Sequence, residues 1–161
     1  MTVNQISLDF FRSYVHGEAR FHPGVNVIVG ENAQGKTNLL EAIAYLSSAS
    51  SHRARYDREL IRHGVDHAFL KAQVTSRGRE LTLEADLHRG ARRQLRCNGV
   101  KLKTAGELSG VLNTVLFCPE DLFLIREGAE ARRRFLDGCI CQLRPRYAQA
   151  LAEYKRLYQH K

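Results

Sequence analysis

The sequence predicts an α/β fold, and three observations along its 161 residues carry that prediction. A short β-branched run at residues 25–29 leads through a glycine-containing loop into a helical pattern at residues 36–46. Stretches with strand periodicity follow between residues 68 and 97, and the last part of the chain has helical spacing. A chain of this length can form one domain with its own buried core.

The first elements are two strands and a helix. Residues 3–10 alternate imperfectly between apolar and polar side chains, which predicts a strand. Residues 25–29 follow the turn pair Pro23-Gly24 and are almost continuously apolar, which is typical of a strand buried on both faces. From Lys36 the apolar residues recur at helical spacing until "SSASS" ends the pattern.

The middle of the chain reads as successive strands and not as alternating strands and helices. Residues 68–74 and 81–87 alternate, with the turn "SRGR" between them. A third stretch, "RRQLRC", ends at Asn98-Gly99, the strongest short signal for a hairpin. We therefore expect an antiparallel segment here.

The last part of the chain is predicted to be mostly helical. Thr104 and Glu107 have the spacing of a capping box that opens a short helix. "TVLFC" at 114–118 predicts another buried strand, which Pro119 ends. Helical patterns then cover residues 129–143 and begin again at Pro145.

One face of the final helix is aromatic and apolar. Its members are Tyr147, Leu151, Tyr154 and Tyr158. This spacing predicts an amphipathic helix lying against the sheet. The alternative, which stays open, is the root of a longer helical arm that the chain does not complete.

The net charge of +8 is unevenly distributed. Residues 50–103 contain 13 Lys or Arg and only 6 Asp or Glu. Arginine outnumbers lysine there, which favours forked contacts with phosphate groups over simple solubilising charge. A polyanion partner is therefore indicated.

The cysteine spacing and the hydropathy pattern indicate in which cellular compartment the protein is expected. The four cysteines have no CxxC spacing, which favours reduced, buried thiols. No apolar run is long enough for a membrane span, and the first residues lack the pattern of a signal peptide. We expect a cytoplasmic protein. His63 and His67 are separated by Gly64 without a metal-binding motif, so they are expected to face solvent.

The clearest motif is GxxxxGK[ST], the phosphate-binding loop called Walker A. It consists of Gly30, Glu31, Asn32, Ala33, Gln34, Gly35, Lys36 and Thr37. The glycines let the backbone turn its N–H groups towards phosphate oxygens, and the following helix adds its positive end. Lys36 is expected to reach the β- and γ-phosphates, and the hydroxyl of Thr37 to bind Mg²⁺. The motif predicts binding of a nucleoside triphosphate such as ATP with Mg²⁺.

Hydrolysis needs an acidic residue at the end of a neighbouring strand, and the sequence offers no convincing one. Glu120 and Asp121 follow Pro119, which displaces them from the strand end, and Glu84 and Asp86 fall on the polar face of an alternating strand. "ELSGVL" at 107–112 lacks the second glycine and the glutamine of the LSGGQ signature. The chain therefore has a phosphate site without the rest of a catalytic centre.

Four stretches together resemble the RecF family, which belongs to the ABC/SMC-like ATPases with Rad50. They are "LDFFRSY" at 8–14, "GVNVIVGENAQGKTNLLEAI" at 24–43, "SHR" at 51–53 and "VLFCPEDLFLIREGAEARRRFLD" at 115–137. Phe10 stands where the family usually has Asn. The last two stretches are those that separate RecF from the Rad50 and SMC heads.

The resemblance implies an incomplete P-loop NTPase of the ABC/SMC-like head type. Residues 1–128 would form most of lobe I, with its sheet, P-loop helix and antiparallel β segment. Residues 129–161 would form the C-terminal helices that lead to the arm of lobe II. Family members are longer, so the chain is expected to be an N-terminal fragment, and the family's Walker B strand and signature motif lie outside it.

The resemblance also implies a function in DNA recombination, repair and replication. RecF proteins form an ATP-dependent homodimer, bind DNA with single-stranded regions or gaps, and cooperate with RecO and RecR to load RecA in the SOS response. A whole protein of this family is expected to be a slow DNA-dependent ATPase. This chain is expected to bind ATP without hydrolysing it.

Further site residues follow from the same resemblance. Arg12 matches an arginine near the nucleotide, the alternative being a solvent-facing strand arginine. Arg53 matches an arginine loop that faces nucleotide or DNA, the alternative being a plain surface loop. Arg132 and Arg133 are candidates for DNA contacts, although with Arg134 they cannot all share one helix face. The segment "PED" falls where related heads have a glutamine, which puts a sensing role for Glu120 in doubt.

Other function classes fit parts of the sequence. A small P-loop phosphotransferase would suit the length, but such enzymes alternate strands and helices after the loop. A transporter-type ATPase domain would need a better signature motif. A basic nucleic-acid module with an idle P-loop remains an alternative.

Overall fold

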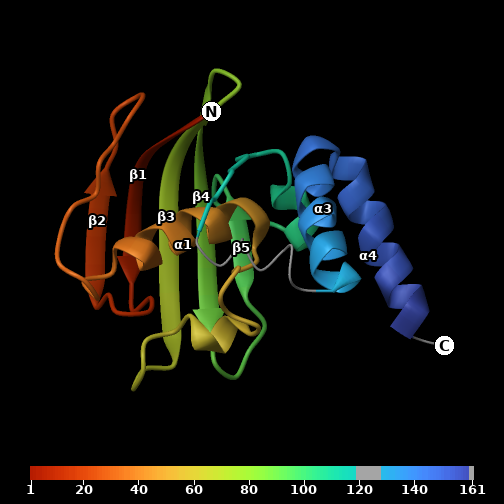
Figure 1. Cartoon of the computed structure of the whole chain (residues 1–161), viewed down its shortest axis with the longest axis horizontal. Helices are drawn as coiled ribbons and strands as arrows, with labels where there is room; N and C mark the ends of the chain where they lie inside the picture. Colours follow the sequence, from red (N-terminus) through yellow and green to blue (C-terminus); the bar gives the residue numbers. More distant parts are fainter. Residues whose placement is uncertain (119–127, 160–161) are drawn as a thin grey trace.

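A computed structural model describes residues 1–118 and 128–159. These residues form a six-stranded antiparallel sheet with one helix lying across a face of it and two helices beside it (Figure 1). Glu120 and Asp121, which the sequence places after a predicted strand, lie in residues 119–127, outside the described residues.

The sheet has the strand order β2-β1-β3-β4-β5-β6. The strands are β1 (Thr2–Asp9), β2 (His16–Arg20), β3 (His67–Ser76), β4 (Arg79–His88), β5 (Gln94–Cys97) and β6 (Val100–Lys101). The α-helices are α1 (Lys36–Ser48), α3 (Ala129–Leu143) and α4 (Pro145–Gln159), with short 3-10 helices η1 (Asp57–Glu59) and η2 (Ala105–Leu108).

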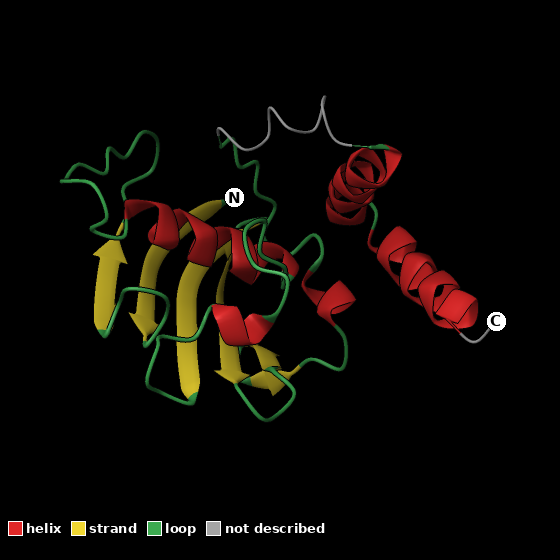
Figure 2. Cartoon of the chain, turned by 60° about the horizontal axis from the view of Figure 1, so that its bottom comes forward, coloured by secondary structure: helices red, strands yellow, loops and turns green. Residues whose placement is uncertain are grey.

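The core lies between the sheet and α1 (Figure 2). Alternate residues of β3 and β4 point into it because successive side chains of a strand face opposite sides. The fully or almost fully buried strand residues are Ile6, Leu8, Ala68, Leu70, Ala72, Val74, Leu83, Ala85 and Leu87. From α1, Leu39, Ala42, Tyr45 and Leu46 meet them. The helix is thereby fixed along its length to the middle of the sheet.

Both predicted hairpin turns are confirmed. Arg77 and Gly78 join β3 to β4 with φ angles of 50° and 74°, and Asn98 and Gly99 join β5 to β6 with 51° and 75°. Two successive positive φ angles are those of a type I′ turn, which suits the twist of paired strands. The capping box of Thr104 and Glu107 is also present, at the start of η2.

Two predicted buried strands are absent from the described structure, so those predictions were wrong. Residues 25–29 form no strand, and Val25 and Val29 are 90% and 82% exposed. Residues 114–118 likewise form no strand, and Val115 and Phe117 are exposed. An apolar β-branched run becomes a buried strand only where neighbours supply hydrogen bonds on both sides. Within residues 1–118 and 128–159, no strand pairs with either segment.

Two further elements differ from expectation. β2 was not predicted, because "HGEAR" has no apolar alternation; it is an edge strand held by backbone pairing to β1. The prediction that the last helix lies against the sheet was wrong. α4 packs against α3 and η2, and Tyr154 and Tyr158 stack on each other in solvent.

A polar cluster ties the far end of α1 to the loop that follows it. The hydroxyl of the fully buried Tyr45 donates to Asp57 Oδ1 at 2.9 Å. Arg93 donates to both carboxylate oxygens of Asp57, at 3.1 and 3.0 Å, and to the carbonyl of Ala49 at 2.8 Å. Burial raises the pKa of Tyr45, so the phenol stays protonated and keeps donating. The cluster sets the path of residues 49–57.

We predict that Tyr45→Phe lowers the free energy of unfolding by about 1–2 kcal/mol, because it removes a buried hydroxyl that pairs with Asp57 and Arg93. Urea denaturation followed by circular dichroism measures the change. Tyr158→Phe is the control, since Tyr158 is 70% exposed. Equal stability of the two variants would show that the buried hydroxyl is not a stabilising contact.

Candidate nucleotide-binding site

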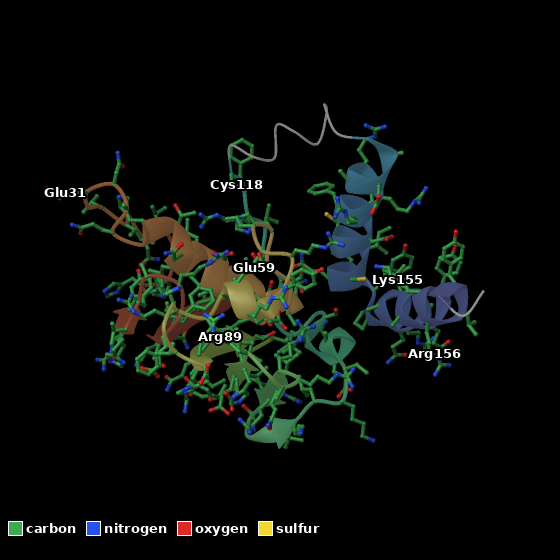
Figure 3. All side chains as sticks on the ribbon, turned by 90° about the horizontal axis from the view of Figure 1, so that it is seen from below. Glu31, Glu59, Arg89, Cys118, Lys155 and Arg156 are labelled. Carbon is green, nitrogen blue, oxygen red and sulfur yellow. The ribbon has the colours of Figure 1, made fainter. Side chains whose placement is uncertain are left out.

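The glycine loop projects from the start of α1, and Figure 3 shows Glu31 on it, away from Glu59 and Arg89. Residues 30–34 are exposed, whereas Gly35 is buried. The φ angles of Gly30, Ala33 and Gly35 are 154°, 66° and 97°. Positive φ angles at three of six consecutive residues bend the backbone sharply, and backbone N–H groups in such a bend can face a common anion.

The N-terminal end of α1 adds donors to the same place. The first intrahelical bond runs from the N–H of Leu39 to the carbonyl of Gly35, at 3.0 Å. The N–H groups of the residues before Leu39 are therefore not used by the helix. Gly35 supplies no capping side chain, and the first turn holds no acidic residue. The helix end is thus an open site for negative charge.

The side chain of Lys36 lies back across the loop. Its ammonium donates to the carbonyls of Gly30 and Glu31 at 2.8 and 2.6 Å. An ammonium has three N–H donors, so one remains after these contacts. Thr37 is exposed, and its hydroxyl has no hydrogen-bond partner among residues 1–118 and 128–159. Both side chains are available to a ligand at the loop.

The base of the loop is packed against residues 10–15, here called the 10–15 turn. A Cβ on Gly35 would lie 2.9 Å from Ser13 Oγ and 3.1 Å from the ring of Tyr14. Tyr14 also donates its hydroxyl to the carbonyl of Gly35 at 3.2 Å, and Asn38 donates its amide to Ser13 Oγ at 2.8 Å. Burial raises the pKa of Tyr14, which keeps the phenol a donor. Only glycine satisfies this contact and the positive φ together.

A fully buried carboxylate, Glu41, lies on the second turn of α1. Arg12 binds it with two parallel hydrogen bonds, from Nε to Oε2 at 3.0 Å and from a terminal nitrogen to Oε1 at 2.7 Å. Ser51 donates to Oε1 at 2.5 Å. Burial alone would raise the pKa of Glu41. The hydrogen bonds from Arg12 and Ser51, with the charges of Arg12 and Arg53, outweigh burial and lower that pKa below its ordinary value.

Arg53 also contacts α1. Its guanidinium donates to Asn38 Oδ1 at 3.2 Å and lies 3.5 Å from Glu41 Oε2. Ser51 Oγ accepts the backbone N–H groups of Arg53 and Ala54, both at 2.9 Å, which holds the loop in place. Arg53 therefore lies at the start of α1 with Arg12.

A hollow of about 520 Å³ opens beside Asn38, and we call it the arginine hollow. It is lined by Arg12, Ser13, Asn38, Arg58, Glu59, Ile61, His63 and Arg89. Its volume lies within the range of small-molecule pockets, and its lining carries more positive than negative charge. A second, apolar hollow of about 480 Å³ lies between the C-terminal end of α1, residues 113–116 and α3. The second is away from the glycine loop and offers few charged groups.

The structure brings some of the predicted site residues together and separates others. Arg12 and Arg53 both contact α1 immediately after the glycine loop. Arg132 and Arg133 instead lie exposed on α3, which packs against α4. Glu84 pairs with Lys71 and Asp86 with His88 on the outer face of the sheet, as their alternation predicted.

Glu41 and its neighbours Ser13, Asn38 and Ser51 were missed as parts of the site. One signal was present: Glu41 is a lone charge within the apolar run "NLLEAIAYL" of a predicted helix. A carboxylate in such a place needs buried partners, and the arginines were the candidates. Which arginines they are depends on long-range packing.

The described residues were also compared with the requirements of a metal site and of a membrane-spanning helix. No group of three or more His, Cys, Asp or Glu side chains in residues 1–118 and 128–159 is arranged to hold a metal ion. His63 and His67 are exposed, as predicted. None of the described helices is long and apolar enough to cross a bilayer.

Comparison with protein families gives one match that covers most of the chain. The model described as "RecF/RecN/SMC N terminal domain" matches residues 2–122. This range includes the glycine loop, the 10–15 turn and every strand of the sheet.

Curated relatives are similar over almost the whole chain. The DNA replication and repair protein RecF of Acidothermus cellulolyticus is 42% identical over 97% of this chain and 42% of its own length. The protein of the same description from Nocardioides sp. is 45% identical over 98% of this chain and 37% of its own length. The chain thus spans about two fifths of the length of these relatives.

Solved structures have a backbone fold similar to that of this chain. A structure of the recombination mediator protein RecF-ATP in the RecFOR pathway has a TM-score of 0.91 and 36% identity, and covers 96% of this chain and 43% of that chain. A structure of an SMC ATPase, from work on ATP-driven dimerization, has a TM-score of 0.67 at 21% identity and covers 85% of this chain. The latter likeness concerns the fold alone.

We predict that Gly35→Ala destabilises the protein by about 1–3 kcal/mol, because the methyl group meets Ser13 and Tyr14 at a positive φ. Thermal denaturation measures the loss. Gly64→Ala is the matched control, since Gly64 has a φ of 86° but no atom within 4 Å of the added Cβ. A larger loss at Gly64 would contradict the packing argument.

Proposed function

The chain belongs to the RecF/RecN/SMC N-terminal domain family, and from that premise we propose that it is the ATP-binding part of a RecF-type DNA replication and repair ATPase. The resemblance and the fold class predicted from the sequence are confirmed by the family match and by the solved structures. In this proposal residues 1–128 belong to lobe I of an ATPase head, and residues 129–161 lead to its arm.

The observation that carries the proposal is the open end of α1, with free backbone donors and Lys36 lying across the loop. These residues fit a triphosphate: residues 30–37 surround its phosphates with N–H donors, and the ammonium of Lys36 exchanges loop carbonyls for phosphate oxygens. Thr37 holds Mg²⁺ through its hydroxyl, and the ion neutralises phosphate charge when bound. Arg12, which lines the arginine hollow beside Asn38 and binds Glu41, adds positive charge at the first two turns of α1, next to the phosphates.

We further propose that the chain binds ATP without rapid hydrolysis. Catalysis of phosphoryl transfer needs a free acidic or water-orienting group near the γ-phosphate and Mg²⁺. Glu41, the acidic residue of α1, is already bound by Arg12, Ser51 and Arg53. The carboxylate of Glu41 is therefore already paired within the protein and is not available to bind Mg²⁺.

DNA is the proposed macromolecular partner. The relatives are described as DNA replication and repair proteins, and residues 50–103 carry 13 basic against 6 acidic side chains. Exposed Arg132 and Arg133 on α3 supply a second basic surface. The whole protein is proposed to act as an ATP-dependent homodimer on single-stranded or gapped DNA, with RecO and RecR, in RecA loading and the SOS response.

Two alternatives are less well supported. A small P-loop phosphotransferase would alternate strands and helices after the loop, whereas β3, β4 and β5 follow α1 as an antiparallel series. A transporter-type ATPase domain does not account for relatives named RecF at 42–45% identity.

We predict that Lys36→Met raises the dissociation constant for Mg-ATP by more than about tenfold, because it removes a charge-assisted donor to the phosphates. Titration with fluorescent ATP measures affinity, and phosphate release on the same sample should stay at background. Lys71→Met, on the outer face of the sheet, is the control. Unchanged affinity in Lys36→Met would refute the phosphate role of the loop, and brisk turnover by the unaltered chain would refute binding without hydrolysis.

We predict that affinity for single-stranded DNA falls steeply with salt, because arginine–phosphate contacts release counterions. Replacing Arg132 or Arg133 with Ala should reduce the slope of log K against log salt by about 1. Fluorescence anisotropy at several salt concentrations measures it. Arg20→Ala, at the β2 edge, is the control, and an affinity independent of salt would contradict the proposed contacts.

A further inference from the structure

The carboxylate of Glu41 is charged, fully buried and close to the proposed nucleotide site. Thr37 and Glu41 are four residues apart on α1, so their side chains lie on one face of the helix. A buried charge needs strong partners, and Arg12 is the closer of its two charged partners, which it contacts through two parallel hydrogen bonds. The pair lies next to the loop that is proposed to hold the phosphates.

The contacts of Arg12 leave part of its guanidinium available. Its Nε and one terminal nitrogen donate to Glu41, and the other terminal nitrogen donates to the carbonyl of Glu59 at 3.0 Å. A guanidinium has five N–H donors, and the contacts within the described residues engage three of them. Arg12 also lines the arginine hollow, and its side chain is 22% exposed. The two remaining N–H donors are therefore on a guanidinium that the carboxylate of Glu41 and the backbone carbonyl of Glu59 hold in position.

We propose that Glu41 is a positioning residue that holds the guanidinium of Arg12 towards the phosphates of a nucleotide bound at the glycine loop. This inference rests on the proposed function. Glu41 touches no ligand itself and acts through Arg12. Because Arg12 is fixed before the nucleotide arrives, less side-chain freedom is lost on binding than for a mobile surface arginine.

A second set of contacts supports this assignment. Arg53 reaches Glu41 and Asn38 together, and Asn38 in turn donates to Ser13, next to Arg12. Both positive side chains therefore contact residues in the first two turns of α1. Glu41 neutralises one of the two charges, which lets the arginines lie near each other without a ligand.

The test is a double-mutant cycle on the affinity for Mg-ATP. We expect Glu41→Gln to raise the dissociation constant about tenfold, since the neutral amide accepts only one of the two guanidinium bonds. In an Arg12→Gln background, Glu41→Gln should add less than about a twofold change, because the residue through which it acts is gone. Glu84→Gln, which removes the partner of Lys71 on the outer face of the sheet, should leave the affinity unchanged.

The outcomes separate this inference from the proposed function. Affinity in Glu41→Gln equal to that of the unaltered chain overturns the inference, as does an equal effect of Glu41→Gln with and without Arg12. If binding depends on Lys36 but not on Glu41, the inference fails alone. If the unaltered chain binds no Mg-ATP, both fail.

A second variant covers the case in which Glu41→Gln does not fold. Arg12→Lys keeps the charge but cannot form the forked pair with Glu41. We expect it to weaken Mg-ATP binding about tenfold while the thermal transition is retained. Full affinity in Arg12→Lys would overturn the role of a positioned guanidinium.

Discussion

The contact between the buried carboxylate of Glu41 and Arg12 is the interaction on which the rest of the site depends. A buried charge that loses a partner costs free energy, so the contacts from Arg12 and Ser51 stabilise α1 in its place. The contact therefore joins three segments that are distant in sequence: the 10–15 turn, α1 and residues 51–54. Once they are joined, Gly35 lies against Ser13 and Tyr14, and the start of the helix is set.

The two sides of the glycine loop are held by different numbers of contacts. The sheet and α1 share one apolar core, which holds the C-terminal side of the loop firmly. On the other side, residues 25–29 are exposed and are not paired with any described strand. Asn26 nevertheless closes the preceding turn by bonding to both the N–H and the carbonyl of His22, each at 2.9 Å. An anion bound at the glycine loop would add contacts to the side of the loop that has the fewest. A ligand that binds only the folded protein also stabilises the folded protein.

Much of the fold follows from local sequence signals. The helix from Lys36, the two hairpin turns and the capping box of Thr104 are each decided by a few neighbouring residues, and each prediction holds. The predictions for residues 25–29 and 114–118 failed for the opposite reason. Whether an apolar run is a buried strand depends on which strands lie beside it, and the run itself contains no information about them.

The candidate site likewise contains residues that local sequence predicts and residues that only packing brings together. The sequence by itself determined the phosphate-binding loop, because the glycines, Lys36 and Thr37 are close in the chain and their spacing is the motif. It also determined the basic character of residues 50–103. Only the tertiary structure decided that Arg12 and Arg53 meet Glu41, while Arg132 and Arg133 lie elsewhere on α3. The physical reason is that periodicity and turn propensity describe neighbours in the chain, whereas the partner of a buried charge is chosen by the packing of distant segments.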